Sequence, residues 1–168
     1  MIVVLIGVSG SGKTTIGVAL AKKMGAEFAD ADDYHSKANK AKMASGHPLT
    51  DEDRKPWLET LNGVLRGWKD AGKSGVLACS ALKDTYRGML SAGMPAGTVR
   101  FVLLDVPREL LEKRLAARKH SFMNPGLLDS QYAALERPGA DAVVVENDRA
   151  EDEVVGEIVE RLGGTASS

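Results

Sequence analysis

Short apolar runs alternate with longer amphipathic stretches along this chain. The apolar runs have the length and composition of buried strands, and they cover residues 2–6, 27–29, 75–79, 99–104 and 142–146. Helical spacing of apolar positions marks the stretches between them, at residues 13–24, 37–44, 51–71, 83–92, 107–118, 127–136 and 151–162. Strands that alternate with helices in this way predict an α/β fold, in which a five-stranded parallel sheet has helices on both faces.

The length and charge of the chain limit what it can do. Its 168 residues are enough for one domain, which we expect over residues 1–163, and the small polar residues 164–168 are expected to form a disordered tail. With 22 Lys and Arg against 23 Asp and Glu, the chain offers no basic surface for nucleic acid or for an anionic membrane. Cys79 is the only cysteine, which excludes an intrachain disulfide and suits a reducing cytoplasm.

The first predicted strand runs into a phosphate-binding motif. Residues 7–14 read GVSGSGKT and fit G-x-x-x-x-G-K-[ST], with a predicted helix directly after them. Backbone N–H groups and the helix N-terminus of such a loop bind the phosphates of ATP. We expect Lys13 to reach the β- and γ-phosphates and the Thr14 hydroxyl to bind Mg²⁺. The other residues of the predicted ATP site are Gly7, Val8, Ser9, Gly10, Ser11, Gly12 and Thr15.

Two carboxylates follow the second predicted strand. Asp30 and Asp32 are two positions apart, a spacing that turns both side chains to one side of an extended chain. Ligands of open α/β sheets bind at that edge, so we expect Asp32 to be the base for an acceptor hydroxyl and Asp30 to bind Mg²⁺ through water. The lack of an acid after the third strand, where Ser80 stands, favours this assignment. Alternatively, the two acids cap a helix or lie in solvent.

Basic residues near the same predicted edge indicate an acceptor that carries a carboxylate. Arg54 lies early in one helix, and Lys83 and Arg87 are four positions apart at the start of another. An arginine can bind a carboxylate through two parallel hydrogen bonds, and a lysine provides a point charge. Each of these residues alone is also typical of a solvated surface. His35 comes soon after the acidic pair, and we expect it to hydrogen-bond the acceptor.

A further basic cluster precedes a connection that contains proline and glycine. Arg114, Arg118 and Lys119 lie near the end of a predicted helix, and we expect a hinged lid over about residues 118–127. Closure of the lid would bring Arg118 to the transferring phosphoryl group and Arg114 to the nucleotide. The alternative is a surface helix whose C-terminus favours cations.

Together these motifs resemble the gluconate kinases, which are related in fold to the shikimate and adenylate kinases. The resemblance covers residues 2–146 and is carried by GVSGSGKTT, DADDYH, NKAKMASGHPLTDEDRKPWL, CSALKDTYR and LLDSQYAALERPGAD. It implies a cytoplasmic enzyme, commonly a dimer, that uses ATP to phosphorylate D-gluconate to 6-phosphogluconate for the pentose phosphate or Entner-Doudoroff route. The carboxylate end of gluconate would meet Arg54, Lys83 and Arg87, and its hydroxyls would meet Asp32 and His35.

The chain departs from the pattern of that family at two places. Ser36 stands where the family usually has proline, so we expect a looser start to the helix that follows. The lid reads His120, Ser121, Phe122 in place of glycine, histidine, phenylalanine, and we assign no role to a lid histidine.

Two other functions remain open from the residues alone. A kinase for shikimate or for a nucleoside monophosphate would share the phosphate loop. However, CSALK stands where shikimate kinases have a glycine triplet, and an aromatic content of 5% offers few platforms for a nucleobase. A nucleotide sensor without catalysis also fits the loop, and it would retain its activity without Asp32.

Overall fold

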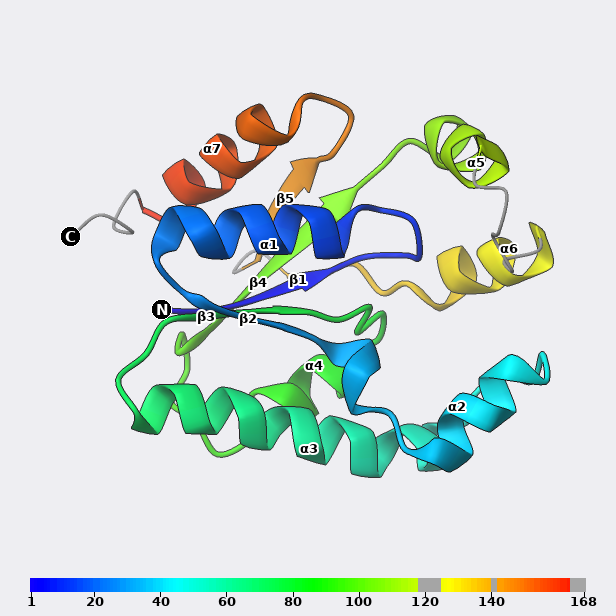
Figure 1. Ribbon diagram of the computed structural model, residues 1–168, viewed down its shortest axis with the longest axis horizontal. Helices are drawn as coiled ribbons and strands as arrows, with labels where there is room; N and C mark the ends of the chain where they lie inside the picture. The colour runs from blue at the N-terminus through cyan, green and yellow to red at the C-terminus, as the bar shows by residue number, and fades with distance from the viewer. Residues whose placement is uncertain (118–124, 140–141, 164–168) are drawn as a thin grey trace.

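A parallel sheet of five strands lies at the centre of the protein (Figure 1). The computed structural model describes residues 1–117, 125–139 and 142–163. The strands pair in the order β2-β3-β1-β4-β5. The five predicted strands are confirmed, each within one residue at either end, as β1 (Ile2–Ile6), β2 (Glu27–Asp30), β3 (Gly75–Ala78), β4 (Val99–Asp105) and β5 (Val143–Glu146).

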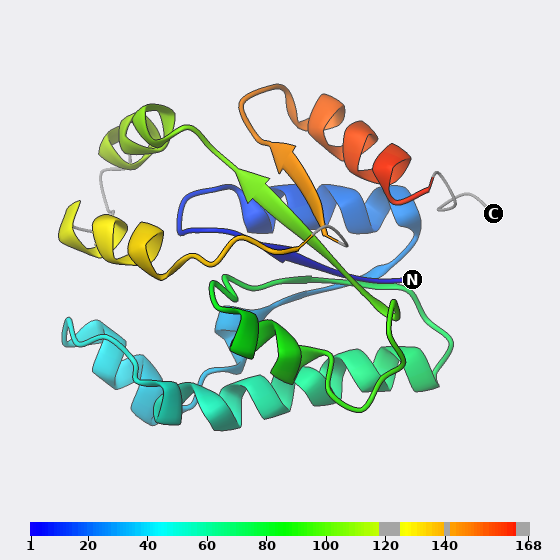
Figure 2. The same ribbon diagram turned by 180° about the vertical axis from the view of Figure 1, so that it is seen from behind.

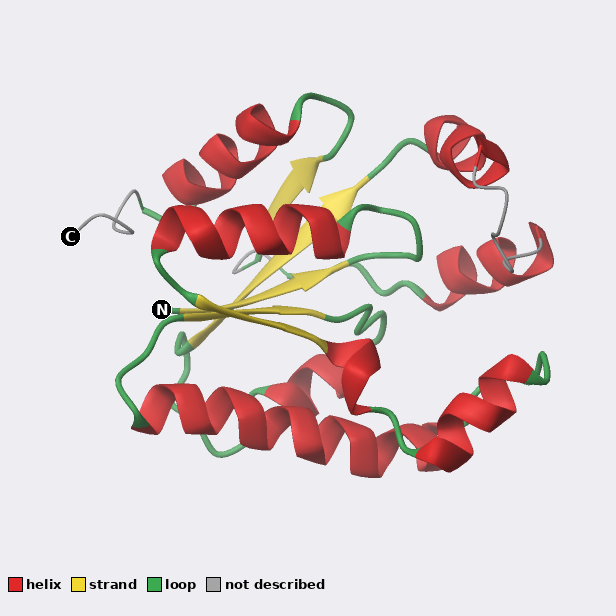
Figure 3. Cartoon of the chain, in the orientation of Figure 1, coloured by secondary structure: helices red, strands yellow, loops and turns green. Residues whose placement is uncertain are grey.

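Helices cover both faces of this sheet, as predicted (Figures 1 and 3). One face packs against α1 (Lys13–Met24) and α7 (Glu151–Arg161), and the other packs against α3 (Asp51–Asp70) and α4 (Asp84–Leu90). The remaining helices lie beyond the carboxyl ends of the strands, and they are α2 (Lys37–Ala44), α5 (Arg108–Ala117) and α6 (Pro125–Ala134). Within the described ranges, no helix is long and apolar enough to cross a membrane.

The side chains of β1 alternate between two hydrophobic cores. Val3 and Leu5 pack with α1 and α7, whereas Ile2, Val4 and Ile6 pack with α3 and α4. This division follows from the strand geometry, since successive side chains point to opposite faces of a sheet. The second core also contains the buried Trp57, and Trp68 packs against its margin.

A smaller third core joins the segments that surround the carboxyl edge. Val8 of the phosphate loop packs with Leu82, which follows β3, and with Leu128 of α6. Val106 and Leu111 complete the cluster, and all five side chains are buried. The loops at this end of the sheet are therefore held together by apolar contacts, as well as by the polar contacts described below.

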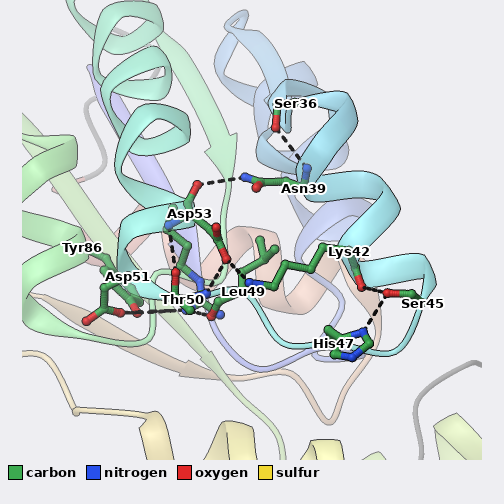
Figure 4. A network of polar contacts seen from close by, with 11 residues as sticks. Ser36, Asn39, Lys42, Ser45, His47, Leu49, Thr50, Asp51, Asp53 and Tyr86 are labelled. Carbon is green, nitrogen blue, oxygen red and sulfur yellow. Dashed lines mark hydrogen bonds and ion pairs between the residues drawn. The ribbon is translucent and has the colours of Figure 1, made fainter.

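Polar contacts fix α2 against the start of α3 (Figure 4). The Asn39 side chain donates a hydrogen bond to the carbonyl of Asp53, and Lys42 pairs with the Asp53 carboxylate at 2.6 Å. Thr50 and Asp53 form a reciprocal capping box at the first turn of α3. The expected looser start of α2 is wrong, because the Ser36 hydroxyl accepts a hydrogen bond from the Asn39 N–H and caps the helix.

Candidate active site

A cavity of about 350 Å³ lies at the carboxyl ends of β1, β2 and β3. The phosphate loop and the first turn of α1 form one side of it, and the ends of β2 and β3 form the other. The structure thus brings Lys13 and Asp32 to the same cavity. Its lining residues are Ser9, Gly10, Gly12, Lys13, Thr14, Thr15, Asp30, Asp32, Ala78, Cys79 and Ser80.

The phosphate loop needs its glycines for both conformation and space. Gly10 and Gly12 have φ angles of +82° and +93°, a left-handed region that side chains disfavour. A Cβ atom on Gly12 would lie 2.4 Å from Nδ2 of Asn147, and one on Gly10 would lie 2.9 Å from the Leu111 side chain. Neighbouring elements therefore pack directly on the backbone of the loop, which leaves no room for larger residues.

Lys13 is folded back onto its own loop. Its ammonium group donates hydrogen bonds to the carbonyls of Gly7 and Val8, both at 2.9 Å. Burial lowers the pKa of Lys13 to about 8, although the nearby charges of Asp32 and Asp30 act in the opposite direction. An anion in the cavity would favour the protonated form of this lysine.

Asp30 connects the end of β2 to the first turn of α1. Its Oδ2 accepts a hydrogen bond from the Thr14 hydroxyl at 2.7 Å, and its Oδ1 accepts one from the Asp32 N–H at 3.0 Å. The second contact caps a short 3₁₀ helix, η1 (Ala31–Tyr34). The extended conformation expected for residues 30–32 is therefore wrong, and the alternative that Asp30 caps a helix is correct. Both acids nevertheless line the cavity, because η1 turns Asp32 towards it.

The environment of Asp32 favours a protonated carboxyl group more than water does. Loss of hydration raises the pKa of Asp32, and the like charge of Asp30 raises it further. A protonated His35 ring and the Lys13 ammonium act in the opposite direction. A carboxylate with a raised pKa is a stronger base than an ordinary aspartate, so this position can accept a proton from a hydroxyl group.

His35 is buried against an aromatic ring of α3. Its imidazole stacks on Trp57 with the ring centroids 4.1 Å apart, and Trp57 is itself fixed by a hydrogen bond to the carbonyl of Ala31. Burial lowers the pKa of His35, which keeps the ring neutral near neutral pH. Its Nδ1 has no hydrogen-bond partner within the described residues. The structure places His35 next to η1, but not in the lining of the cavity.

Arg54 and Lys83 both contact Tyr86. Each cationic group lies 5.5 Å from the centroid of the Tyr86 ring, within the range of a cation–π contact. Arg54 also donates a hydrogen bond to the Tyr86 hydroxyl at 3.2 Å, and Lys83 lies 3.5 Å from the Asp51 carboxylate, which accepts a hydrogen bond from the same hydroxyl. Asp51 and Tyr86 had no predicted role, although both lie in motifs that the chain shares with the gluconate kinases.

Arg87 does not share the surroundings of Lys83. Its side chain is buried, and its guanidinium donates to the carbonyls of Ala81 and Glu136, at 2.8 and 2.6 Å, and pairs with Asp84. Ala81 has a φ of +37°, so Arg87 holds a strained turn directly after β3. These contacts favour a structural role, and the contact of Arg87 with an acceptor carboxylate stays a prediction.

The remaining predicted cations lie on or beyond α5. Arg114 donates a hydrogen bond to the carbonyl of Asn147 at 2.8 Å and does not line the cavity. Arg118 and Lys119 lie outside the described residues, as do residues 118–124 of the predicted lid and the tail at 164–168. Residues 125–127, which we assigned to the lid, begin α6.

Two residues that contact the phosphate loop had no assigned role in the sequence. Asn147 is buried after β5 and donates a hydrogen bond to the carbonyl of Ser11 at 2.7 Å. Gln131 of α6 forms two hydrogen bonds with Ser9. No local sequence pattern identifies either residue, because each contacts a loop residue more than 120 positions away in the chain.

A phosphate loop that faces two carboxylates across one cavity, on this sheet, defines a P-loop kinase. A family model described as an AAA domain matches residues 2–138. The chain is 49% identical to the probable gluconokinase of Dictyostelium discoideum over 142 residues, which are 82% of this chain and 71% of that protein. It is 41% identical to the thermoresistant gluconokinase of Escherichia coli, with 95% of this chain and 91% of that protein covered.

Solved structures agree with these sequence relatives. The crystal structure of a gluconokinase from Sinorhizobium meliloti superposes with a TM-score of 0.86 at 37% identity, and the match covers 98% of this chain and 92% of that chain. This chain belongs to the gluconokinase family.

Proposed function

We propose that this protein transfers the γ-phosphate of ATP to the 6-hydroxyl of D-gluconate, which yields ADP and 6-phosphogluconate. The observation that carries the proposal is the shared cavity of Lys13 and Asp32, in a chain whose relatives are named gluconokinases. The product would enter carbohydrate metabolism through the pentose phosphate or Entner-Doudoroff route.

Asp32 would act as the base of this transfer. The acceptor oxygen forms a bond to the γ-phosphorus as the bond to the bridging oxygen of ADP breaks, and Asp32 takes the proton of the hydroxyl. Lys13, at the opposite wall, would stabilise the charge of the β- and γ-phosphates. The raised pKa of Asp32 supports this role, because it brings the basicity of the carboxylate closer to neutral pH.

The oxygens around Thr14 fit a magnesium ion that accompanies ATP. Mg²⁺ prefers oxygen ligands and keeps several waters, and the Thr14 hydroxyl and the Asp30 carboxylate lie 2.7 Å apart at the edge of the cavity. The described residues contain no group of three or more His, Cys, Asp or Glu that could hold a metal. We propose that Thr14 binds the ion directly and Asp30 binds it through water, with phosphate oxygens as further ligands. The ion would neutralise negative charge on the β- and γ-phosphates.

Arg54 and Lys83 would bind the carboxylate end of gluconate. Both cations share the Tyr86 ring as a platform, so their charges are held close together. His35 would bind a hydroxyl of the substrate between this cluster and Asp32. Its ring is neutral near neutral pH because burial lowers its pKa, and its Nδ1 has no hydrogen-bond partner within the described residues, which supports a contact with a hydroxyl. The contact of Arg87 with the substrate carboxylate stays a prediction, and Arg114 and Arg118 would act on the phosphates when the lid closes.

The test is a coupled assay of ADP release with gluconate, shikimate, AMP or no acceptor. We expect ADP release with gluconate alone, and phosphorus NMR of the product should show a phosphate monoester on the terminal hydroxyl. Release with shikimate or AMP would assign the chain to another kinase activity. ATP binding without release in any mixture would favour the nucleotide sensor.

The family resemblance also supports two proposals on assembly and location. We propose that the protein forms a homodimer, which sedimentation at micromolar concentration would detect as twice the mass of 17.9 kDa. We propose a cytoplasmic location, in keeping with the single buried thiol of Cys79. Cell fractionation tests the second proposal.

A further inference from the structure

A short segment at the end of α6 contacts both sides of the candidate active site. We call residues 131–136 the bracket. At its first residue, the Gln131 side-chain oxygen accepts a hydrogen bond from the Ser9 N–H at 2.6 Å, and the side-chain nitrogen donates to the Ser9 hydroxyl at 3.0 Å. The amide of Gln131 thus binds both the N–H and the hydroxyl of Ser9, the third residue of the phosphate loop.

The last residue of the bracket is bound to the connection between β3 and α4 and to the start of α4. The Glu136 N–H donates to the carbonyl of Leu82 at 2.7 Å, and its side chain accepts from the Asp84 N–H at 2.9 Å. The Glu136 carbonyl also accepts from Arg87 at 2.6 Å. Lys83 lies between Leu82 and Asp84, so its backbone is fixed to residue 136 through contacts on both sides.

Apolar packing holds the bracket between the two loops. Leu128 of α6 is buried with Val8 of the phosphate loop and Leu82 of the acceptor side, and Leu135 of the bracket packs against the same cluster. Figure 2 shows the chain that leaves α6 passing between the phosphate loop and the loop after β3. Four residues therefore separate the contact to Ser9 from those to the loop of Lys83, and three of the four, Tyr132, Ala134 and Leu135, pack against the apolar cluster.

We propose that Gln131 is a positioning residue. It sets the position of the phosphate loop relative to the loop after β3, which carries Lys83 and which we call the acceptor loop. The inference rests on the proposed kinase activity, because the distance between these loops decides whether the acceptor oxygen and the γ-phosphorus meet in line. Gln131 acts through Ser9, since it orients the Ser9 N–H and hydroxyl at the wall of the cavity, and it is not itself a catalytic residue. Glu136 fixes the other end of the bracket next to Lys83.

The main test is Gln131→Leu, which keeps the approximate size of the side chain and removes both hydrogen bonds. Two net hydrogen bonds correspond to a loss of roughly thirtyfold in kcat/KM for ATP. The matched control is Ser130→Ala, at the preceding exposed position of α6, which should retain wild-type kinetics. A merely structural role would lower the melting temperature and leave the kinetic parameters of the folded enzyme unchanged.

A second readout separates this inference from the choice of substrate. Affinity for a non-hydrolysable ATP analogue is measured without acceptor, and Gln131→Leu should weaken it even if gluconate proves not to be phosphorylated. The double variant with Ser9→Ala should lose less than the sum of the two single variants, because both changes remove the same contact. Additive losses would place the effect of Gln131 elsewhere and overturn the proposal.

If Gln131→Leu does not fold, Ser9→Ala carries the test. That variant removes one of the two hydrogen bonds and leaves the backbone N–H in place, so a loss of about fivefold in kcat/KM is expected. Kinetic parameters and analogue affinity within twofold of wild type, in whichever variant folds, would overturn the proposal.

Discussion

The hydroxyl of Thr14 donates a hydrogen bond to Asp30 at 2.7 Å, which joins the first turn of α1 to the end of β2. Mutation of a residue that orients a metal ligand typically lowers metal affinity by about ten- to a hundredfold. We therefore expect Asp30→Ala to raise the Mg²⁺ concentration for half-maximal activity by about tenfold, with a smaller change in the KM for gluconate.

Thr14→Val and Thr14→Ser form a matched pair for the same site. Valine has the shape of threonine without the hydroxyl, so Thr14→Val should raise the Mg²⁺ concentration for half-maximal activity at least as much as Asp30→Ala. Serine keeps the hydroxyl and should stay close to wild type. A titration of Mg²⁺ at saturating ATP checks all three variants, and equal Mg²⁺ requirements throughout would remove this pair from the metal site.

Asp32→Asn separates the base role from nucleotide binding. The amide keeps the size of the carboxylate but cannot take a proton, so kcat should fall by about 10²- to 10⁴-fold. ATP affinity, measured by calorimetry, should change only a few-fold. A parallel loss of ATP affinity and turnover would contradict the assignment.

The like charge of Asp30 predicts a shift in the pH profile. Activity that needs ionised Asp32 is lost as the pH falls through the raised pKa of that group. Asp30→Asn removes a charge that raises this pKa, so the acid limb of kcat against pH should move to lower pH. The control is Glu27→Gln, at the opposite end of β2, which should leave the limb in place. A limb that moves to higher pH in Asp30→Asn would show that another group controls it.

The fold could be predicted from the sequence because each of its signals is local. Apolar runs, glycine turns and helical spacing located every strand of the sheet and each of its helices to within a few residues. The exception is η1, where Asp30 turns the chain by a side-chain contact with a backbone N–H two residues on. Such a contact is common for aspartate, but the same residues are also compatible with an extended chain.

The candidate site was less accessible to sequence reasoning than the fold. The phosphate loop and Asp32 follow from a motif and from the general position of ligands in α/β sheets. The burial of Arg87 could not be predicted in this way, because it depends on the strained turn at Ala81 that sets the start of α4. Gln131 and Asn147 reach the loop only through the packing of distant segments, which no local pattern encodes.

Arg54 provides a test of the acceptor end. A charge-assisted bidentate bond to a carboxylate is strong, so Arg54→Ala should raise the KM for gluconate by roughly ten- to a hundredfold. The KM for ATP should change by less than threefold. Lys73→Ala is the control, because that exposed cation pairs with Glu27 at the amino end of β2. A gluconate KM that stays unchanged in Arg54→Ala would remove this arginine from the site.

The low pKa of Lys13 predicts that nucleotide binding takes up a proton. In the free protein, burial lowers the pKa of this group to about 8, so above that pH most molecules carry a neutral lysine. The negative charges of the ATP phosphates favour the ammonium form and raise the pKa again. At pH 8.5, binding should therefore take up a proton, and the uptake should fade towards pH 7, where Lys13 is already protonated. Calorimetry in buffers of different ionisation enthalpy measures this proton uptake directly.

Lys13→Met isolates the contribution of this lysine to the uptake. The variant keeps an unbranched side chain of similar length and has no group to protonate, so residual binding at pH 8.5 should occur without the lysine's share of the proton uptake. ATP affinity in the variant should also depend less on pH between 7 and 9, because the wild-type ammonium is lost progressively over that range. Unchanged proton uptake in Lys13→Met would mean that a different group responds to the phosphates, and that the lysine is already charged in the free protein.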